Sequence, residues 1–111
     1  MSTLNFNQVF QTIESGVESL AKSSLHDYLA QAKNDGKSIV DGMKAELQQW
    51  TSELEEGALT MEDMNYLLKE EAALTEMTAL KEAGLAAVRI DEFKNGITNV
   101  IMGAVAGIIK V

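Results

Sequence analysis

A chain of 111 residues, 46% of them hydrophobic and 23% charged, has the size and composition of one globular domain, which excludes a second domain and a disordered chain. The net charge of −8, with nine Lys and Arg spread singly, excludes nucleic acid as an expected partner, because no basic patch would meet phosphate. The absence of Pro permits long helices, and the absence of Cys excludes disulfide and thiolate chemistry.

The first predicted helix follows an amino terminus without a Sec-type signal, so the protein is expected to be cytoplasmic or exported by another route. Asn5, with Gln8 three residues later, is a good N-cap. Large apolar residues then recur at steps of three and four along one helical stripe: Phe6, Val9, Phe10, Ile13, Val17 and Leu20. At Ser23-Ser24 two interpretations stay open, a second capping box with Asp27 or an uninterrupted helix.

A second stripe runs from Leu25 to Leu54 at the same steps and predicts a long, nearly straight helix. Asn34-Asp35-Gly36 has the composition of a turn, but the apolar spacing passes through it without a change of phase. We therefore expect the helix to continue there.

The clearest break is at Gly57, which suits a left-handed residue after a helix, followed by a capping box of Thr60 with Asp63. Helical spacing then resumes from Met64 to Ile108, where only Gly84 and Asn95-Gly96 are expected to allow an interruption.

This turn divides the chain into arms of nearly equal length, which predicts an all-α fold: an antiparallel helical hairpin with helices at about residues 5–56 and 60–109, either unbroken or each broken once. Residue i would then face roughly residue 116 − i, which brings Trp50 to Tyr66 and Leu67, Leu20 to Gly96, Ile13 to Gly103, and residues 6–10 to Gly107. An unbroken hairpin would be about 75 Å long and could not cover both stripes. The chain, a single domain over residues 1–111, is thus expected to form a four-helix bundle alone or as a dimer.

The candidates for chemistry are few. His26 is the only His, and its neighbours Ser23 and Ser24 point in other directions on a helix, so no nucleophile and base pair is expected. The Glu-x-x-His pattern of di-metal bundles is absent, as are calcium and phosphate loops. We therefore predict no catalytic residue, no metal and no cofactor.

The carboxy-terminal segment is the most apolar part of the chain, because residues 95–109 carry no charge and Gly103 and Gly107 form a GxxxG pair. The segment is too short to span a bilayer, which makes membrane contact a possible but less favoured alternative.

These patterns predict a non-catalytic interaction or structural protein that self-associates and binds a protein partner. The expected helix-packing residues come from both arms: Phe6, Phe10, Ile13, Val17, Trp50, Tyr66, Leu67, Phe93, Ile97, Gly103 and Gly107. The alternatives are a lipid-associating protein that acts through residues 95–109 and a small helical hairpin or chaperone of a secretion system.

The two-helix plan with a central Trp50 resembles the WXG-type secreted helical hairpins. However, Trp50-Thr51-Ser52 lacks the Gly of that motif, and the predicted turn lies several residues later, at Gly57. The chain is therefore assigned to no family from its sequence.

Overall fold

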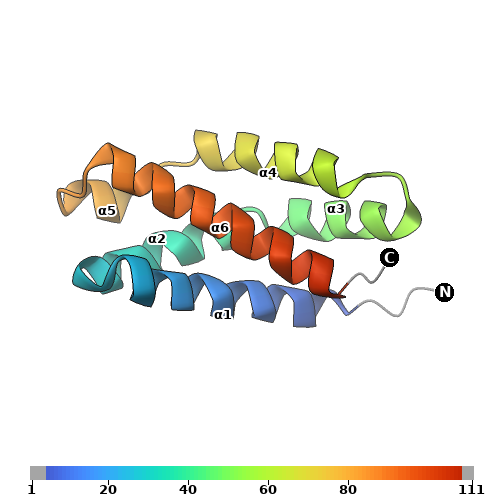
Figure 1. The fold of residues 1–111 in the computed structure, drawn as a ribbon, viewed down its shortest axis with the longest axis horizontal. Helices are drawn as coiled ribbons and strands as arrows, with labels where there is room; N and C mark the ends of the chain where they lie inside the picture. The colour runs from blue at the N-terminus through green and yellow to red at the C-terminus, as the bar shows by residue number, and fades with distance from the viewer. Residues whose placement is uncertain (1–4, 109–111) are drawn as a thin grey trace.

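The structure, a computed structural model, describes residues 5–108, and within them every regular element is helical. The helices run in chain order and are labelled in Figure 1: α1 (Phe6–Ser24), a 3-10 turn (His26–Tyr28), α2 (Leu29–Gly42), α3 (Lys44–Glu56), α4 (Met61–Leu74), α5 (Thr78–Glu82) and α6 (Ala87–Ile108). The predicted all-α class is confirmed. The predicted end of the second helix at Ile109 lies outside the described residues.

Helix α1 begins where the sequence predicts. The side chain of Asn5 accepts hydrogen bonds from the backbone N–H groups of Asn7 and Gln8, at 3.0 and 3.4 Å, and so satisfies two donors that have no partner inside the helix. The stripe predicted for this helix turns inward: Val9, Phe10, Ile13 and Val17 are buried.

The predicted straight rod from Leu25 to Leu54 is wrong. Leu25 leaves the helical conformation (φ −133°, ψ 45°), and the 3-10 turn after it separates α1 from α2. A second interruption at Met43 separates α2 from α3. The break after Ser24 realises one of the two alternatives left open at Ser23-Ser24, although no side chain caps the 3-10 turn there. Apolar spacing did not reveal the break at Met43, because a short loop can restart the next helix in nearly the same phase. Asn34-Asp35-Gly36 lies inside α2, as expected.

The central turn agrees with the prediction. Gly57 adopts a left-handed conformation (φ 81°), which ends α3 and which residues with a Cβ adopt at a cost. Thr60 then caps α4: its hydroxyl accepts from the Asp63 N–H at 3.0 Å, and the Asp63 carboxylate accepts from the Thr60 N–H at 3.3 Å.

The second arm is broken at one expected place and at one unexpected place. Gly84, with φ 92°, lies in the expected break before α6, whereas Asn95-Gly96 does not interrupt α6. The unexpected break separates α4 from α5, where Thr75 is extended (φ −89°, ψ 128°).

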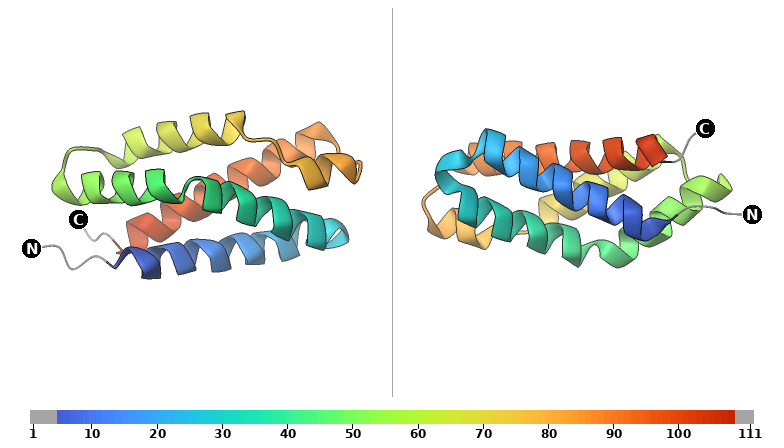
Figure 2. Two further views of the ribbon diagram at one scale, coloured as in Figure 1. Left: turned by 180° about the vertical axis from the view of Figure 1, so that it is seen from behind. Right: turned by 90° about the horizontal axis from the view of Figure 1, so that it is seen from below.

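The interruptions let the helices fold back on one another (Figures 1 and 2). The molecule measures 47 × 22 × 19 Å, so an unbroken hairpin of about 75 Å is excluded. Helix α6 lies against α1 and α4, while α2 lies against α1 and α5. The buried apolar side chains of all six helices form one cluster, with Ile13, Leu47, Leu68, Leu80 and Ile101 fully buried.

Candidate interaction surfaces

His26, Ser23 and Ser24 lie on the surface. His26 is in the 3-10 turn with its side chain 75% exposed, and its Nε2 is 3.0 Å from a carboxylate oxygen of Asp27, itself 72% exposed. The Ser23 hydroxyl donates to the Leu20 carbonyl and not to His26. Within residues 5–108, no group of three or more His, Asp or Glu side chains is arranged to hold a metal ion.

The eleven predicted packing residues divide by exposure. Six are buried in the core, namely Phe10, Ile13, Val17, Trp50, Phe93 and Ile97. Phe6 and Leu67 are half-buried at its edge. The other three are exposed, with Tyr66 at 64% and Gly103 and Gly107 also open. Tyr66 is therefore not part of the core. Its predicted contact with Trp50, like any contact of the eleven with a second chain, stays a prediction.

Two glycines bring α1 and α6 together. A Cβ built on Gly16 would lie 2.5 Å from Cγ1 of Val100, and one built on Gly96 would lie 2.7 Å from Cδ2 of Leu20. In both pairs residue i of α1 meets residue 116 − i of α6, so the predicted contact of Leu20 with Gly96 is confirmed. The missing Cβ lets the helix axes approach closely at these two places.

The same rule fails towards the end of α6. Among the described residues, no atom lies within 4 Å of a Cβ built on Gly103 or Gly107, so neither glycine receives the bulky side chain expected from α1. Together with Asn99 and Ala106, these two glycines form an exposed, uncharged strip, which we name the α6 outer face.

A contact that the sequence did not predict joins α2 to α5. The Asp35 carboxylate, only 5% exposed, accepts hydrogen bonds from the backbone N–H groups of Ala79 (3.2 Å) and Leu80 (2.7 Å). Asp35 of α2 therefore caps the amino-terminal end of α5, the helix that follows the break after α4. The composition of Asn34-Asp35-Gly36 is typical of a turn and does not indicate a contact with α5. The one sequence signal for this contact is a carboxylate on the apolar side of a helix.

Gly36, the next residue, lies at the junction of three helices. A Cβ there would be 2.7 Å from Cγ1 of Val17 on α1 and 3.7 Å from Cζ of Phe93 on α6. The neighbouring Asp35 and Gly36 thus anchor α2 in two ways, by charge-assisted hydrogen bonds to α5 and by close approach to α1.

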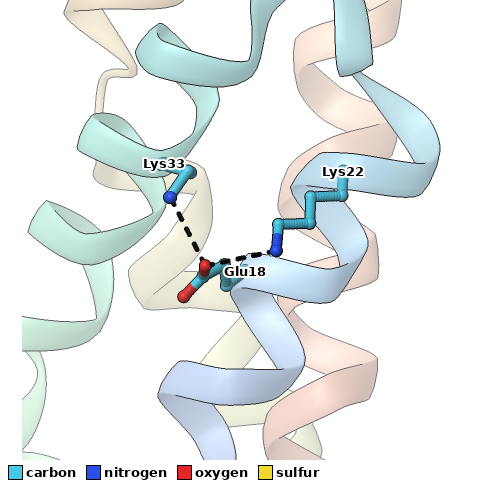
Figure 3. Close-up of polar contacts among 3 residues, drawn as sticks. All are labelled: Glu18, Lys22 and Lys33. Atoms are coloured by element: carbon cyan, nitrogen blue, oxygen red, sulfur yellow. Dashed lines mark ion pairs between the residues drawn. The ribbon is translucent and has the colours of Figure 1, made fainter.

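A small ion-pair cluster bridges α1 and α2 (Figure 3). One carboxylate oxygen of Glu18 lies 3.3 Å from Lys33 Nζ on α2 and 3.5 Å from Lys22 Nζ on its own helix. The hydrogen bond and the charge of Lys33, followed by the charge of Lys22, lower the pKa of Glu18 below its ordinary value of 4.5. Glu18 and Lys33 also line a groove between the two helices, together with Glu14 and Lys37, and Lys37 is paired with Asp41.

A second hollow lies at the start of α4 and is lined by Leu59, Glu62, Asp63, Tyr66 and Leu67. We name it the tip hollow. Tyr66 is 64% exposed and the two leucines are half-buried, so apolar surface reaches solvent here beside two exposed carboxylates. Glu62, Tyr66 and Glu70 are spaced by four residues and share one exposed side of α4.

In the part of the chain that the structure describes, no helix combines the length and the apolar character needed to cross a bilayer. No protein-family model, no curated protein and no solved structure matches the chain.

Proposed function

We propose that the chain is a non-catalytic interaction protein that binds a protein partner and associates with a second copy of itself. The observation that carries the first part is the tip hollow, where a large aromatic side chain, Tyr66, is 64% exposed between two half-buried leucines. Aromatic side chains supply much of the binding energy in protein interfaces and are otherwise mostly covered in a closed fold.

We also propose that a single chain forms an antiparallel four-rod bundle: α1, then α2 with α3, then α4 with α5, then α6. The contacts of α6 with α1 and α4, and of α2 with α1 and α5, support this arrangement. It amounts to a hairpin about Gly57 whose arms each fold back once more, at residues 25–28 and 83–86. A bundle that closes in this way removes the need for a second chain to cover the apolar stripes.

Partner binding is tested by photo-crosslinking from the exposed aromatic position in cells that make the protein. A benzophenone amino acid replaces Tyr66 in one variant and Val88, which is 66% exposed on α6, in the matched control. The proposal predicts a discrete protein adduct from position 66 that position 88 does not give. The same adducts from both positions, or none from either, would contradict it.

Self-association has a separate basis, the α6 outer face. Asn99, Gly103, Ala106 and Gly107 are exposed, and no charged side chain occurs from residue 95 to residue 108, so two copies could approach there without repulsion. Small residues favour such close approach of helices.

The role of the α6 outer face in self-association is tested by sedimentation of two variants in which an alanine is replaced by lysine. Ala106→Lys places a charge on this face, and Ala73→Lys places the same charge on an exposed position of α4. The proposal predicts that only Ala106→Lys shifts the protein to a monomer. A wild-type protein that sediments as a monomer at all concentrations would remove self-association and leave partner binding untouched.

The structure gives the lipid alternative less support. Three large apolar side chains of the uncharged segment, Ile97, Ile101 and Val105, are buried in the core and would have to leave it to enter a bilayer. Co-sedimentation of the intact protein with neutral and anionic vesicles tests this alternative directly.

A further inference from the structure

We propose that the tip hollow binds a basic segment of a partner protein, with an arginine or lysine over the Tyr66 ring and an apolar side chain against Leu59 and Leu67. This inference rests on the proposed function, because it names the chemistry of the partner that the hollow would accept. The apolar lining of the hollow indicates where the partner segment binds, and the neighbouring acids indicate that this segment is basic.

The stretch of chain that contains the hollow is strongly acidic. Residues 53–71 contain seven acids, namely Glu53, Glu55, Glu56, Glu62, Asp63, Glu70 and Glu71, and a single base, Lys69. This stretch therefore carries most of the chain's net charge of −8. All four ion pairs found among residues 5–108 lie on α1, α2 and the turn between them, so none neutralises these acids.

Some of these acids also oppose the local preference of their helix. Glu55 and Glu56 lie in the last turn of α3, where the helix dipole favours cations, and that turn contains no base. Residues that break a local rule without a compensating contact are expected at functional surfaces. A cationic ligand would relieve this repulsion.

The exposed side of α4 matches such a ligand in detail. Tyr66 lies between Glu62 and Glu70 at a spacing of four residues, so a cation over the ring has a carboxylate one turn away on each side. Leu59 and Leu67 border the same hollow and provide the apolar contact. Asp63 is already engaged with the backbone of Thr60, which leaves Glu62 and Glu70 as the proposed partners for the cation.

Charge also argues against the other occupants. A second copy of the chain would bring an equally acidic surface against this one, and anionic lipid headgroups or phosphates would likewise be repelled. A basic segment gains from the same field both in encounter rate and in contact. The tip hollow is therefore assigned to a partner, and the α6 outer face stays the surface proposed for self-association.

The test is a titration of the isotope-labelled full chain with a short synthetic peptide of lysine and leucine in helical period, followed by amide chemical shifts. The proposal predicts shifts centred on residues 59–70 and affinity that falls as salt rises. The same peptide with glutamate in place of lysine should not bind. Equal binding of both peptides, or shifts spread evenly over the molecule, would overturn the proposal.

Matched variants separate the aromatic contact from general charge attraction. Tyr66→Ser should weaken peptide binding by about tenfold, as expected for an aromatic anchor, whereas Val88→Ser, which removes an equally exposed apolar side chain elsewhere, should leave it unchanged. Glu62→Gln with Glu70→Gln should weaken binding and reduce its salt dependence. Because all four positions are exposed, circular dichroism should be the same for every variant.

A peptide affinity that does not respond to Tyr66→Ser would contradict the inference. Failure of this inference can be distinguished from failure of the proposed function. A specific adduct from position 66 without peptide binding would retain a partner and reject its basic character, whereas loss of both results would reject partner binding itself.

Discussion

The middle and the carboxy-terminal end of helix α6 use glycine in opposite ways. Near its middle, Gly96 meets Leu20 of α1, and one turn later Val100 meets Gly16, so glycines mark the closest approach of two helices. Towards its carboxy-terminal end, a Cβ built on Gly103 or Gly107 would meet no described atom within 4 Å beyond the local backbone of α6. A glycine in a helical stripe therefore indicates close contact with another helix only when its side of the helix faces the core. Each enclosed glycine can be tested by comparing its substitution with the substitution of an exposed glycine.

The largest effect is expected at Gly36, the glycine enclosed by three helices. Gly36→Leu should destabilise the fold by about 3 kcal/mol, because its Cβ would already lie 2.7 Å from Cγ1 of the stiff, buried Val17. Gly42→Leu is the control in the same helix: nothing lies within 4 Å, and leucine favours the helix, so stability should rise by up to about 1 kcal/mol. Urea unfolding measures both, and equal effects would show that Gly36 is not enclosed.

The next effect concerns the polar contact beside Gly36. Asp35→Ala should cost about 2 kcal/mol, because it removes the buried acceptor of the Ala79 and Leu80 N–H groups. Asp41→Ala removes only an exposed pair with Lys37 and should cost no more than about 0.5 kcal/mol. Thermal unfolding compares the two, and hydrogen exchange at residues 78–82 should rise selectively in Asp35→Ala. Exchange that stays unchanged there would argue against the cap.

A smaller difference contrasts the two ends of the α1 and α6 pairing directly. Gly16→Ala should destabilise by about 1 kcal/mol, since the clash with Val100 at 2.5 Å exceeds the gain in helix propensity. Gly103→Ala meets no atom and should stabilise by about 0.5 to 1 kcal/mol. The prediction lies in the opposite signs of the two changes in unfolding free energy, and a shared sign would contradict it.

The smallest effect is at the solvent-exposed contact of α1 with α2. Lys33→Gln should raise the pKa of Glu18 towards 4.5, because Lys33 is the main cause of its lowering, and Lys22→Gln should raise it less. A lowered pKa in the folded state means that this pair stabilises the fold above about pH 4.5 and that the contribution is lost as the pH falls through the folded value. Carboxyl carbon shifts of Glu18 during an acid titration measure this, and an unchanged midpoint in Lys33→Gln would argue against the contact.

The sequence predicted the local features of this fold well. Asn5 as a cap, Gly57 as a left-handed stop and the box of Thr60 with Asp63 all follow from rules that act within a few residues. The contact of Leu20 with Gly96 followed from the position of that turn and from equal arm lengths.

The sequence did not predict features that depend on distant partners. The start of α5 after the break at Thr75 is stabilised across the fold by the Asp35 carboxylate, which precedes its partner Leu80 by 45 residues, and apolar spacing carries no trace of this contact. Likewise the hairpin register predicted that Tyr66 and Leu67 lie beside Trp50, yet α4 turns most of the Tyr66 side chain outward. The sequence therefore predicted packing residues where the structure has the tip hollow, although the neighbouring acids can be read from the sequence.

The pairing of α1 with α6 within one chain is tested most directly by a disulfide between Gly16→Cys and Val100→Cys. The built Cβ of Gly16 lies 3.7 Å from Cβ of Val100, which suits a disulfide, and the natural chain has no other Cys. On oxidation, the structure predicts rapid formation of an intramolecular bond, seen by mass spectrometry as a monomer lighter than the reduced chain by two hydrogen atoms. Persistently free thiols, or a bond formed only between chains, would contradict it.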